Sequence, residues 1–385
     1  MTSEAAPATR RVLLHVGVPK SGTSFLQATL RANADRLRAA GVLFPTEQHK
    51  GLFHAALELT GNHPGWGVPQ KRVKGSWARL CKQARAFDGT TVLSNELFSN
   101  ASQTQAETAM RELDGLEVHV VVTARDLARQ LPAEWQEGIK HGRGLRFRPF
   151  LERMLDPERS HDHARKFWRH QDIAELMERW GAGLPPERIH LVTAPPPGAP
   201  RDLLWQRFCA VVGVDPALAV FPEVGANTSL GITAIDVLRR VNKQLRKGDR
   251  PPLLRRTVKQ SLVNGALRQD TSPRVSTPEE LLPRLNEITD DWVKRIEAAG
   301  YEVVGDLADL TPRPAEGAPA DHRVPVRDAR DLAVDAVAVL AREVATLRAE
   351  VQEVDRLRRR VAELESGPDR LRSVVRRARA RLRGE

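Results

Sequence analysis

Cysteines and long apolar runs are scarce in this sequence. Its 385 residues include two cysteines, Cys81 and Cys209, which lie far apart and without partners at metal-binding spacing. This arrangement indicates neither a disulfide framework nor a zinc site. No stretch approaches the roughly 20 apolar residues of a membrane-spanning helix, and the first residues, MTSEAAPATRR, include an acid and no apolar run. We therefore expect a soluble protein of the cytoplasm.

The net charge of +11 is concentrated in two short stretches. The range 239–268 contains ten basic residues and one acid, and the range 370–385 contains seven arginines and one acid. The remainder of the chain carries a small net negative charge. Because a basic surface is therefore local, we do not expect nucleic acid as a partner.

Short runs of branched apolar residues alternate with helical patterns along most of the chain. These runs lie at 12–18, 42–44, 91–93, 118–123, 189–192 and 301–304. Such alternation predicts an α/β fold in which a parallel sheet is covered by helices on both faces.

The C-terminal part has a different pattern. A stretch rich in Pro and Ala, TPRPAEGAPADHRVP, begins at Thr311 and predicts a linker. After it, apolar residues recur in alternating steps of three and four, with one extra step of three, at Val337, Leu340, Val344, Leu347, Val351, Val354, Leu357, Val361 and Leu364. This seam of about four heptads favours a C-terminal coiled-coil helix and a homo-oligomer over a single amphipathic helix docked on the domain.

The predicted organisation has five parts: a disordered N-terminus (1–10), a catalytic domain (11–310), a linker (311–330), a coiled coil (331–366) and a basic amphipathic tail (367–385). In the tail, one helical face carries Leu371, Val374, Val375, Ala378 and Leu382, and arginines occupy the remainder. Such a helix could bind an anionic membrane surface peripherally, at the inner face. A solvated, partly disordered end is the open alternative.

A glycine loop follows the first apolar run, in HVGVPKSGTSFLQ. Gly17 and Gly22 have the spacing of a Walker A loop, and Ser24 supplies its hydroxyl. The position after the second glycine, where the Walker lysine stands, is occupied by Thr23, and Lys20 lies inside the loop instead. A loop of this kind, between a strand and a helix, directs backbone amides and the positive helix end at an anion.

The displaced lysine favours sulfuryl transfer over phosphoryl transfer. In ATP and GTP enzymes the Walker lysine and a Mg²⁺ ion together neutralise the terminal phosphates. A sulfuryl group carries less negative charge, so one cation could suffice without a metal. Lys20 could stabilise the charge that develops on the bridging oxygen of a phosphosulfate as its bond breaks.

The run from Val12 through PKSGTSFLQ resembles the phosphosulfate-binding loop of sulfotransferases that use 3′-phosphoadenosine 5′-phosphosulfate (PAPS). The resemblance covers about 11–310, and IAELMERWGAGLPPERIHLV and DLLWQRFCAVVGVDP are similar to that family's final strand and helix. It implies a P-loop NTPase-like fold, PAPS as co-substrate and no metal. It also implies that the cofactor is bound by Pro19, Lys20, Ser21, Gly22, Thr23 and Ser24.

The resemblance implies two further cofactor contacts. VHVVVTARD places Arg125 at the carboxyl end of a predicted strand, where ligands bind in open α/β sheets, and its guanidinium suits the 3′-phosphate. The family's serine eight residues later is Ala133 here. The segment ANTSLGITA, with Asn227, Ser229 and Gly231, is similar to a third contact region, although a simple turn explains it equally well.

An acceptor hydroxyl requires a base, and two residues are candidates. Glu96, in TTVLSNELF, follows a predicted strand at the same sheet edge as Lys20 and Arg125, and a glutamate has this role in some carbohydrate sulfotransferases. His54, in GLFHAALEL, is the alternative, because other members of the family use histidine. Trp135, Gln136 and His141, in AEWQEGIKHGRG, could line the acceptor site. Trp135 could equally be a core residue.

Taken together, these features predict a PAPS-dependent sulfotransferase that acts on a hydroxyl of a carbohydrate, a glycolipid or another small acceptor. The nearest alternative is a P-loop kinase, which would need a lysine after Gly22 and a metal-binding acid, for which only Glu96 is placed. A non-catalytic scaffold that acts through its coiled coil is an alternative of another class.

Overall fold

The computed structural model describes residues 10–45, 50–222, 230–245, 258–314 and 323–382, and over 364–382 it describes the backbone and the side chain of Val375 alone. These residues form two compact units. The first contains Met1–Ile232 and Pro273–His322, and the second contains Thr233–Ser272 and Arg323–Glu385. The domain boundaries expected from the sequence stay predictions.

Six parallel strands form the sheet of the first unit, in the order β2-β3-β1-β4-β5-β6. The strands are β1 (Arg11–Gly17), β2 (Val42–Leu43), β3 (Thr90–Ser94), β4 (Glu117–Ala124), β5 (Ile189–Thr193) and β6 (Glu302–Val304). Each apolar run of the sequence forms one of them, because branched side chains fit a sheet that is buried on both faces. The strand order reverses around β1, so the carboxyl ends of β3, β1 and β4 form the switch point where ligands bind in such sheets.

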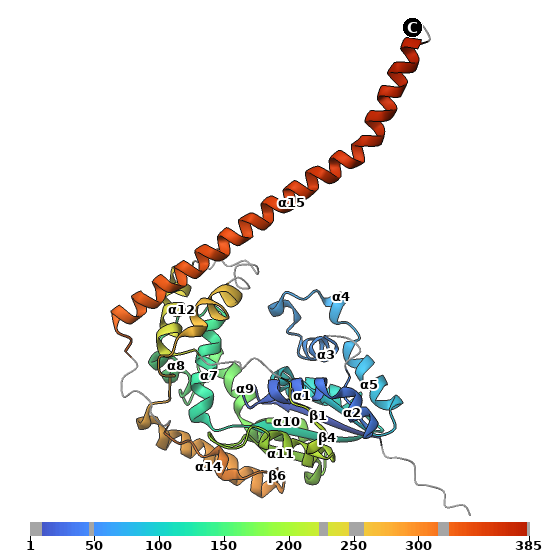
Figure 1. Cartoon of the computed structure of the whole chain (residues 1–385). Coiled ribbons are helices and arrows are strands. Elements are labelled where there is room, and N and C mark those ends of the chain that lie inside the picture. The colour runs from blue at the N-terminus through green and yellow to red at the C-terminus, as the bar shows by residue number, and fades with distance from the viewer. Residues whose placement is uncertain (1–9, 46–49, 223–229, 246–257, 315–322, 383–385) are drawn as a thin grey trace, which may run out of the picture. The chain divides into compact units, whose positions relative to one another are not determined.

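Helices cover both faces of this sheet, which confirms the predicted fold class (Figure 1). The helices of the first unit are α1 (Thr23–Ala32), α2 (Ala34–Ala39), α3 (Gly51–Thr60), α4 (Gln70–Val73), α5 (Ser76–Ala86), α6 (Gln103–Arg111), α7 (Leu127–Lys140), α8 (Phe147–Met154), α9 (Asp162–Gln171), α10 (Ile173–Gly181), α11 (Leu203–Val212) and α14 (Leu282–Ala299). Short 3₁₀ turns join them: η1 (His63–Trp66), η2 (Glu96–Asn100), η3 (Pro186–Arg188), η4 (Pro216–Leu218), η8 (Glu279–Leu281) and η9 (Leu307–Leu310). The core between the layers is aromatic as well as aliphatic, and Trp180, Trp205 and Trp292 are buried in it.

Helix α7 begins directly after β4 and positions much of the site. Asp126 caps its first turn, where the carboxylate accepts a hydrogen bond from the Arg129 amide (2.9 Å). This cap sets the residue at which the helix begins. Side chains four and seven residues apart lie on one face of a helix, so Gln130, Glu134 and Glu137 point in a common direction.

In the second unit, two short helical turns contact the long C-terminal helix. Its elements are α12 (Ile232–Gln244), the π-helical turn η6 (Val258–Val263), the 3₁₀ turn η7 (Ala266–Gln269) and α15 (Val326–Leu382). The Ser261 hydroxyl donates to the Glu343 carboxylate of α15 (2.7 Å). The start of α12 is held by Asp270, which accepts from the Ala234 amide (2.9 Å).

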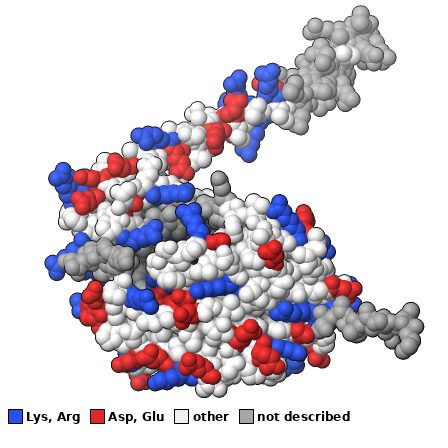
Figure 2. All heavy atoms as spheres, turned by 60° about the horizontal axis from the view of Figure 1, so that its bottom comes forward, with Lys and Arg blue, Asp and Glu red and all other residues white. Residues whose placement is uncertain are grey.

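Helix α15 covers both the predicted coiled coil and the predicted tail. Acidic and basic side chains follow each other along it (Figure 2), with ion pairs such as Arg356–Glu353. Seam residues such as Val344 and Val351 are exposed. Pairing with a second copy stays a prediction, and the side chains of the tail, Val375 apart, lie outside the described residues. None of the helices in the described ranges is sufficiently long and apolar to cross a membrane.

Candidate functional site

The loop between β1 and α1 is held in a conformation that depends on its glycines. Gly17 (φ 93°), Lys20 (φ 68°) and Gly22 (φ 100°) all lie in the left-handed region. A Cβ on Gly22 would clash with the Leu204 side chain, and one on Gly17 would lie 3.0 Å from the Cα of Glu96. A backbone that alternates in this way forms a concave surface of amides at the start of α1, which is suited to an anion.

A chain of hydrogen bonds lies beneath the loop. Ser21 donates its hydroxyl hydrogen to the Val18 carbonyl (2.6 Å), so the Thr123 hydroxyl is the donor in the contact between Thr123 and Ser21 (2.6 Å). Thr123 then accepts from Nε2 of His15 (3.1 Å), and Nδ1 of His15 accepts from the Ser94 hydroxyl (2.7 Å). The chain therefore runs in one direction, from β3 through β1 and β4 to the loop.

His15, in the middle of this chain, is a neutral imidazole. Its side chain is fully buried, and burial lowers its pKa to about 3. A neutral imidazole has a single N–H, and the hydrogen-bond order places that hydrogen on Nε2. The Val18 amide also donates to the Thr123 carbonyl (2.7 Å), so the loop is fixed to β4 by backbone as well as side chain.

Lys20 extends from the loop to helix α7. Its ammonium donates to the Glu137 carboxylate over 2.7 Å, and both side chains are about one-third exposed, at 37% and 27%. Burial alone would raise the pKa of Glu137, but the charge and hydrogen bond of Lys20, with His141 and Lys140, lower it below its ordinary value. Lys20 is thus paired with Glu137, and an anion bound to Lys20 at the loop would lie close to this carboxylate.

Two glutamines connect the loop to Arg125. The Gln130 amide donates to the Pro19 carbonyl (2.9 Å) and to the Gln171 side chain (3.0 Å), and Gln171 also donates to Pro19 (3.3 Å). Arg125 in turn donates to the side-chain oxygen of Gln130 (2.8 Å). The buried side chain of Gln130 therefore links the loop, which is predicted to bind the phosphosulfate, to Arg125, which is predicted to bind the 3′-phosphate.

Arg125 has a charge that no carboxylate in the described part of the chain neutralises. Its guanidinium donates to the Arg129 carbonyl (2.9 Å) as well as to Gln130, while neighbouring Asp126 pairs with Arg129. The Nε atom of Arg125 is buried without a hydrogen-bond partner. Burial, assisted by Arg129 and opposed by Asp126, lowers its pKa to about 10, so it stays protonated near neutral pH. Such a cation fits an anionic ligand.

Glu96 lies at the carboxyl end of β3, directly against the loop. Its Oε2 accepts from the Gln27 amide of α1 (2.9 Å), and the preceding Asn95 amide donates to the His15 carbonyl (3.2 Å). A cavity of about 300 Å³ opens beside it, lined in part by Gln27, Arg31, Lys50, Phe53 and Trp66. In the ranges that the structure describes, no three His, Cys, Asp or Glu side chains are grouped to hold a metal.

The alternative base, His54, lies on α3, and its side chain is not part of the lining of this cavity. Burial, followed by the charges of Lys50, Arg72 and Arg79, lowers its pKa below the ordinary value. The imidazole is therefore neutral near pH 7. Its protonation state suits a base, whereas Glu96 has the better position, next to both the loop and the cavity.

The three residues expected after Arg125 have separate surroundings. Trp135 is 6% exposed, packs on Phe147 and donates its indole N–H to the Leu145 carbonyl (2.9 Å), so it is core. Gln136 is buried as well. His141 is half exposed, and its Nδ1 lies 3.2 Å from the carboxylate that pairs with Lys20.

The third predicted cofactor region is described only in part. Asn227 and Ser229 lie outside the described residues. Gly231 is buried and forms an antiparallel bridge with Arg274. The adjacent Ile232 amide donates to the Pro273 carbonyl (2.8 Å), so this glycine has a backbone role.

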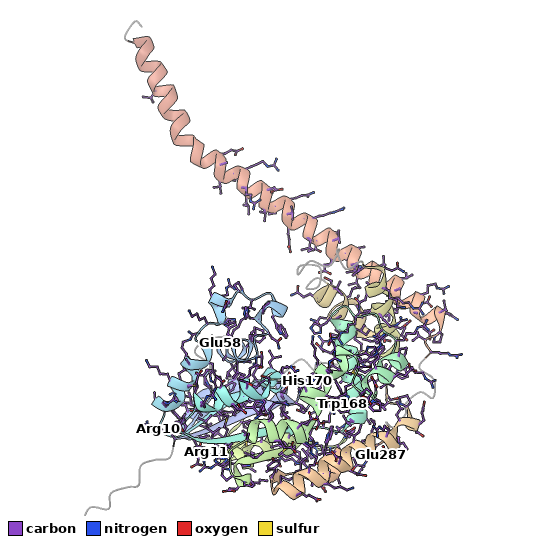
Figure 3. The ribbon with its side chains drawn as sticks, turned by 180° about the vertical axis from the view of Figure 1, so that it is seen from behind. Arg10, Arg11, Glu58, Trp168, His170 and Glu287 are labelled. Carbon is purple, nitrogen blue, oxygen red and sulfur yellow. The ribbon has the colours of Figure 1, made fainter. Side chains whose placement is uncertain are left out.

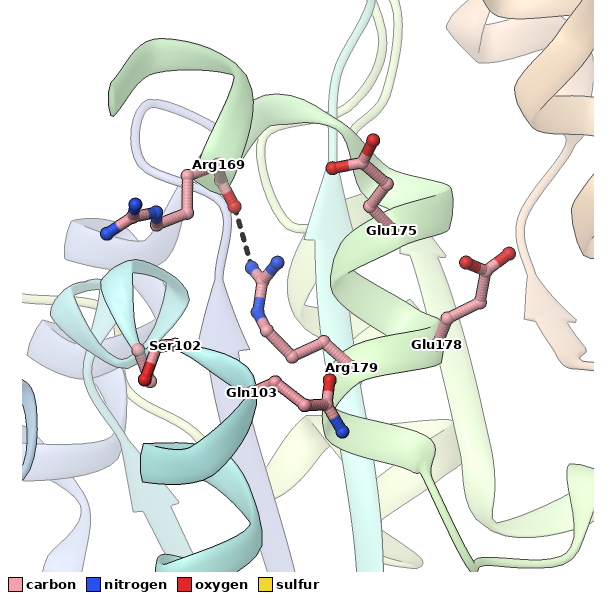
Figure 4. A pocket seen from close by; sticks show the side chains of 7 residues that line it. Ser102, Gln103, Arg169, Glu175, Glu178 and Arg179 are labelled. Carbon is pink, nitrogen blue, oxygen red and sulfur yellow. Dashed lines mark hydrogen bonds between the residues drawn. The ribbon is translucent and has the colours of Figure 1, made fainter. Parts of the chain in front are cut away.

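A larger hollow of about 430 Å³ lies elsewhere on the first unit (Figure 4). Its charged groups include Arg169, Glu175, Glu178 and Arg179, and Arg179 donates to the Arg169 carbonyl (2.6 Å). None of its lining residues belongs to the loop or to the predicted site. The smaller cavity is the one that Glu96 lines, and the backbone of Glu96 lies against Gly17 of the loop.

Sequence reasoning missed the polar face of α7 and the end of α9. Between Gln130 and Glu137, Glu134 accepts from His163 (3.2 Å). Burial would raise the pKa of Glu134, but His163, His170 and Arg143 lower it to about 2. His170, on α9 (Figure 3), also contacts Asn100 in the turn that Glu96 begins (3.3 Å). The capping Asp126 signals where α7 begins, but it does not indicate which side chains of the helix face the loop.

Comparisons with known proteins give a structural match and no sequence match. No protein-family model matches the sequence, and no curated protein matches it. A crystal structure of a sulfotransferase from Alicyclobacillus acidocaldarius matches over 65% of this chain and 99% of that chain, with 14% sequence identity and a TM-score of 0.38. The function of this chain therefore has to be inferred from the geometry of its own site.

Proposed function

We propose that this chain is a sulfotransferase that transfers a sulfuryl group from PAPS to a hydroxyl of a carbohydrate or another small acceptor. The observation that carries the proposal is the loop itself: Lys20 lies inside a turn whose left-handed backbone suits an anion, and Gln130 connects that turn to the uncompensated charge of Arg125. Two cationic subsites joined through one amide suit a ligand with phosphate groups at both ends.

The chain's own residues then have distinct roles. The loop amides and Lys20 would hold the phosphosulfate, and Arg125 would hold the 3′-phosphate. The acceptor oxygen forms a bond to sulfur while the bond from sulfur to the bridging phosphate oxygen breaks. Glu96 accepts the hydroxyl proton, and Lys20 stabilises the electron pair left on the phosphate.

The kinase alternative has less support at the loop. A Walker lysine would have to occupy the position of Thr23, which is buried in the first turn of α1. Lys20 approaches the site from the other end of the turn, and its partner is Glu137. A scaffold role would leave the uncompensated Arg125 without a purpose.

Calorimetry with adenosine 3′,5′-bisphosphate in EDTA tests the proposal. We expect binding without a divalent metal, and binding of adenosine 5′-monophosphate that is weaker by about tenfold or more, because a hydrogen bond to a charged group contributes about 1.5–3 kcal/mol. Arg125→Ala should remove that difference. Lys294→Ala, at an exposed position of α14, is the control. Tight binding of ATP with Mg²⁺ and none of the bisphosphate would establish the kinase instead.

A further inference from the structure

The cavity beside Glu96 has an aromatic wall. Phe53 of α3 and Trp66 of η1 meet edge to face, with ring centroids 5.3 Å apart at an interplanar angle of 85°. Trp66 is nevertheless 53% exposed, which is unusual for the largest apolar side chain. An exposed indole that is held by a second ring provides a flat apolar surface for a ligand ring.

Two cations share this cavity with the aromatic wall. Arg31 lies in the last turn of α1, and Lys50 precedes the first turn of α3. Neither has an ion-pair partner among the residues that the structure describes. The Glu96 carboxylate accepts from the Gln27 amide, and in the described ranges it forms no ion pair with Arg31 or Lys50.

The segment that forms this wall is strongly basic. Residues 50–87 contain seven Lys and Arg side chains and a single acid, Glu58. Glu58 (Figure 3) accepts from the backbone amides of Gly75 (2.5 Å) and Trp77 (2.9 Å), so it stabilises the start of α5 and faces none of the cavity cations as an ion-pair partner. Burial is the largest cause of the lowered pKa of His54, and the charges of Lys50, Arg72 and Arg79 lower it further.

We infer that the acceptor is an anionic sugar, with its ring against Trp66, its acidic group at Arg31 and Lys50, and its reacting hydroxyl at Glu96. This inference rests on the proposed function, since Glu96 is the base of that reaction. The apolar face of a pyranose suits the indole, and a carboxylate or sulfate on the ring supplies a negative charge to pair with the two cations.

Ligand-observed NMR titrations test the inference with three probes: methyl β-D-glucuronide, glucose 6-sulfate and neutral methyl β-D-glucoside. The full chain is titrated with and without adenosine 3′,5′-bisphosphate. We expect at least one anionic probe to bind roughly fivefold or more tightly than the glucoside, as two exposed charges allow. The order of the two anionic probes separates a carboxylate from a sulfate.

Variants assign the effect to the cavity. Arg31→Gln combined with Lys50→Gln should abolish the preference for the anionic probes, and Trp66→Ala should weaken all three probes. Lys294→Gln, which removes a charge on α14, should change nothing. Equal binding of the three probes, or a preference that persists in the double variant, would overturn the inference. So would a Trp66→Ala variant that weakens bisphosphate binding instead, since the cavity would then belong to the cofactor.

The two proposals can fail separately. Loss of bisphosphate binding with an intact glucuronide preference would reject the sulfotransferase and keep an anionic-sugar site. Bisphosphate binding with no preference among the three sugars would keep the sulfotransferase and reject the acidic acceptor.

Discussion

Replacing Glu137 with glutamine should tighten the binding of the bisphosphate. Glu137 holds Lys20 at 2.7 Å in the structure. A phosphate oxygen that is hydrogen-bonded to Lys20 at about 3 Å would lie roughly 5.5 Å from the Glu137 carboxylate, where two unit charges repel by about 3 kcal/mol at an effective dielectric constant of 20. Because both side chains are about one-third exposed, solvent screening reduces this repulsion to about 1–2 kcal/mol.

The expected gain in affinity for adenosine 3′,5′-bisphosphate is therefore about five- to thirtyfold. Glutamine retains the shape of the side chain and an oxygen for Lys20, so the loop should not move. The gain should shrink between roughly 0.02 M and 0.5 M salt, since the repulsion is electrostatic. Titration calorimetry at both salt concentrations measures it, and Glu152→Gln, an exposed acid of α8, serves as the matched control.

A double variant distinguishes this reasoning from a general charge effect. In a Lys20→Ala background, Glu137→Gln should have a smaller effect, because the anion is then no longer drawn to this side of the loop. Unchanged or weaker binding in Glu137→Gln alone, or an equal gain with and without Lys20, would refute the assignment of Glu137 as a competitor for Lys20.

Two further predictions concern the base and the buried histidine. Glu96→Gln should retain bisphosphate affinity and lose about 10²- to 10⁴-fold in transfer rate; an active variant would move the base to His54. For His15, the unfolded chain takes up a proton below its ordinary pKa of 6.5, whereas the folded chain does so only near 3. The stability is therefore fully present above pH 6.5 and is lost as the pH falls, by about 1.4 kcal/mol per unit from this group. Urea unfolding at pH 7 and pH 5 measures it, and equal midpoints would contradict the assignment.

The parts of the site that are close in sequence or lie at strand ends could be predicted. The loop was evident from its two glycines between an apolar run and a helical pattern. Glu96 was expected near Lys20 because parallel strands end at one edge of the sheet, and the structure places its Cα against Gly17. Both inferences follow from local sequence and from the common edge at which parallel strands end, so they do not depend on how the helices pack.

The partners supplied by helices could not be predicted. Glu137 and Gln130 are more than a hundred residues from the loop, and nothing local marks them as loop ligands. The same limit applied to Trp135, which could have faced the acceptor or the core. A helical pattern indicates which residues share a face, but packing against α8, where Phe147 lies, decided which face was inward.

The one-way hydrogen-bond chain beneath the loop restricts how this sequence can change. Ser94, His15, Thr123 and Ser21 each donate to the next member or to the loop backbone, so none is interchangeable with an isosteric apolar residue. Thr123→Val, for example, would leave the imidazole N–H without an acceptor and Ser21 without its donor. Variants at these positions should be viable only as sets, so a library that randomises all four together should yield folded solutions that single-site libraries miss.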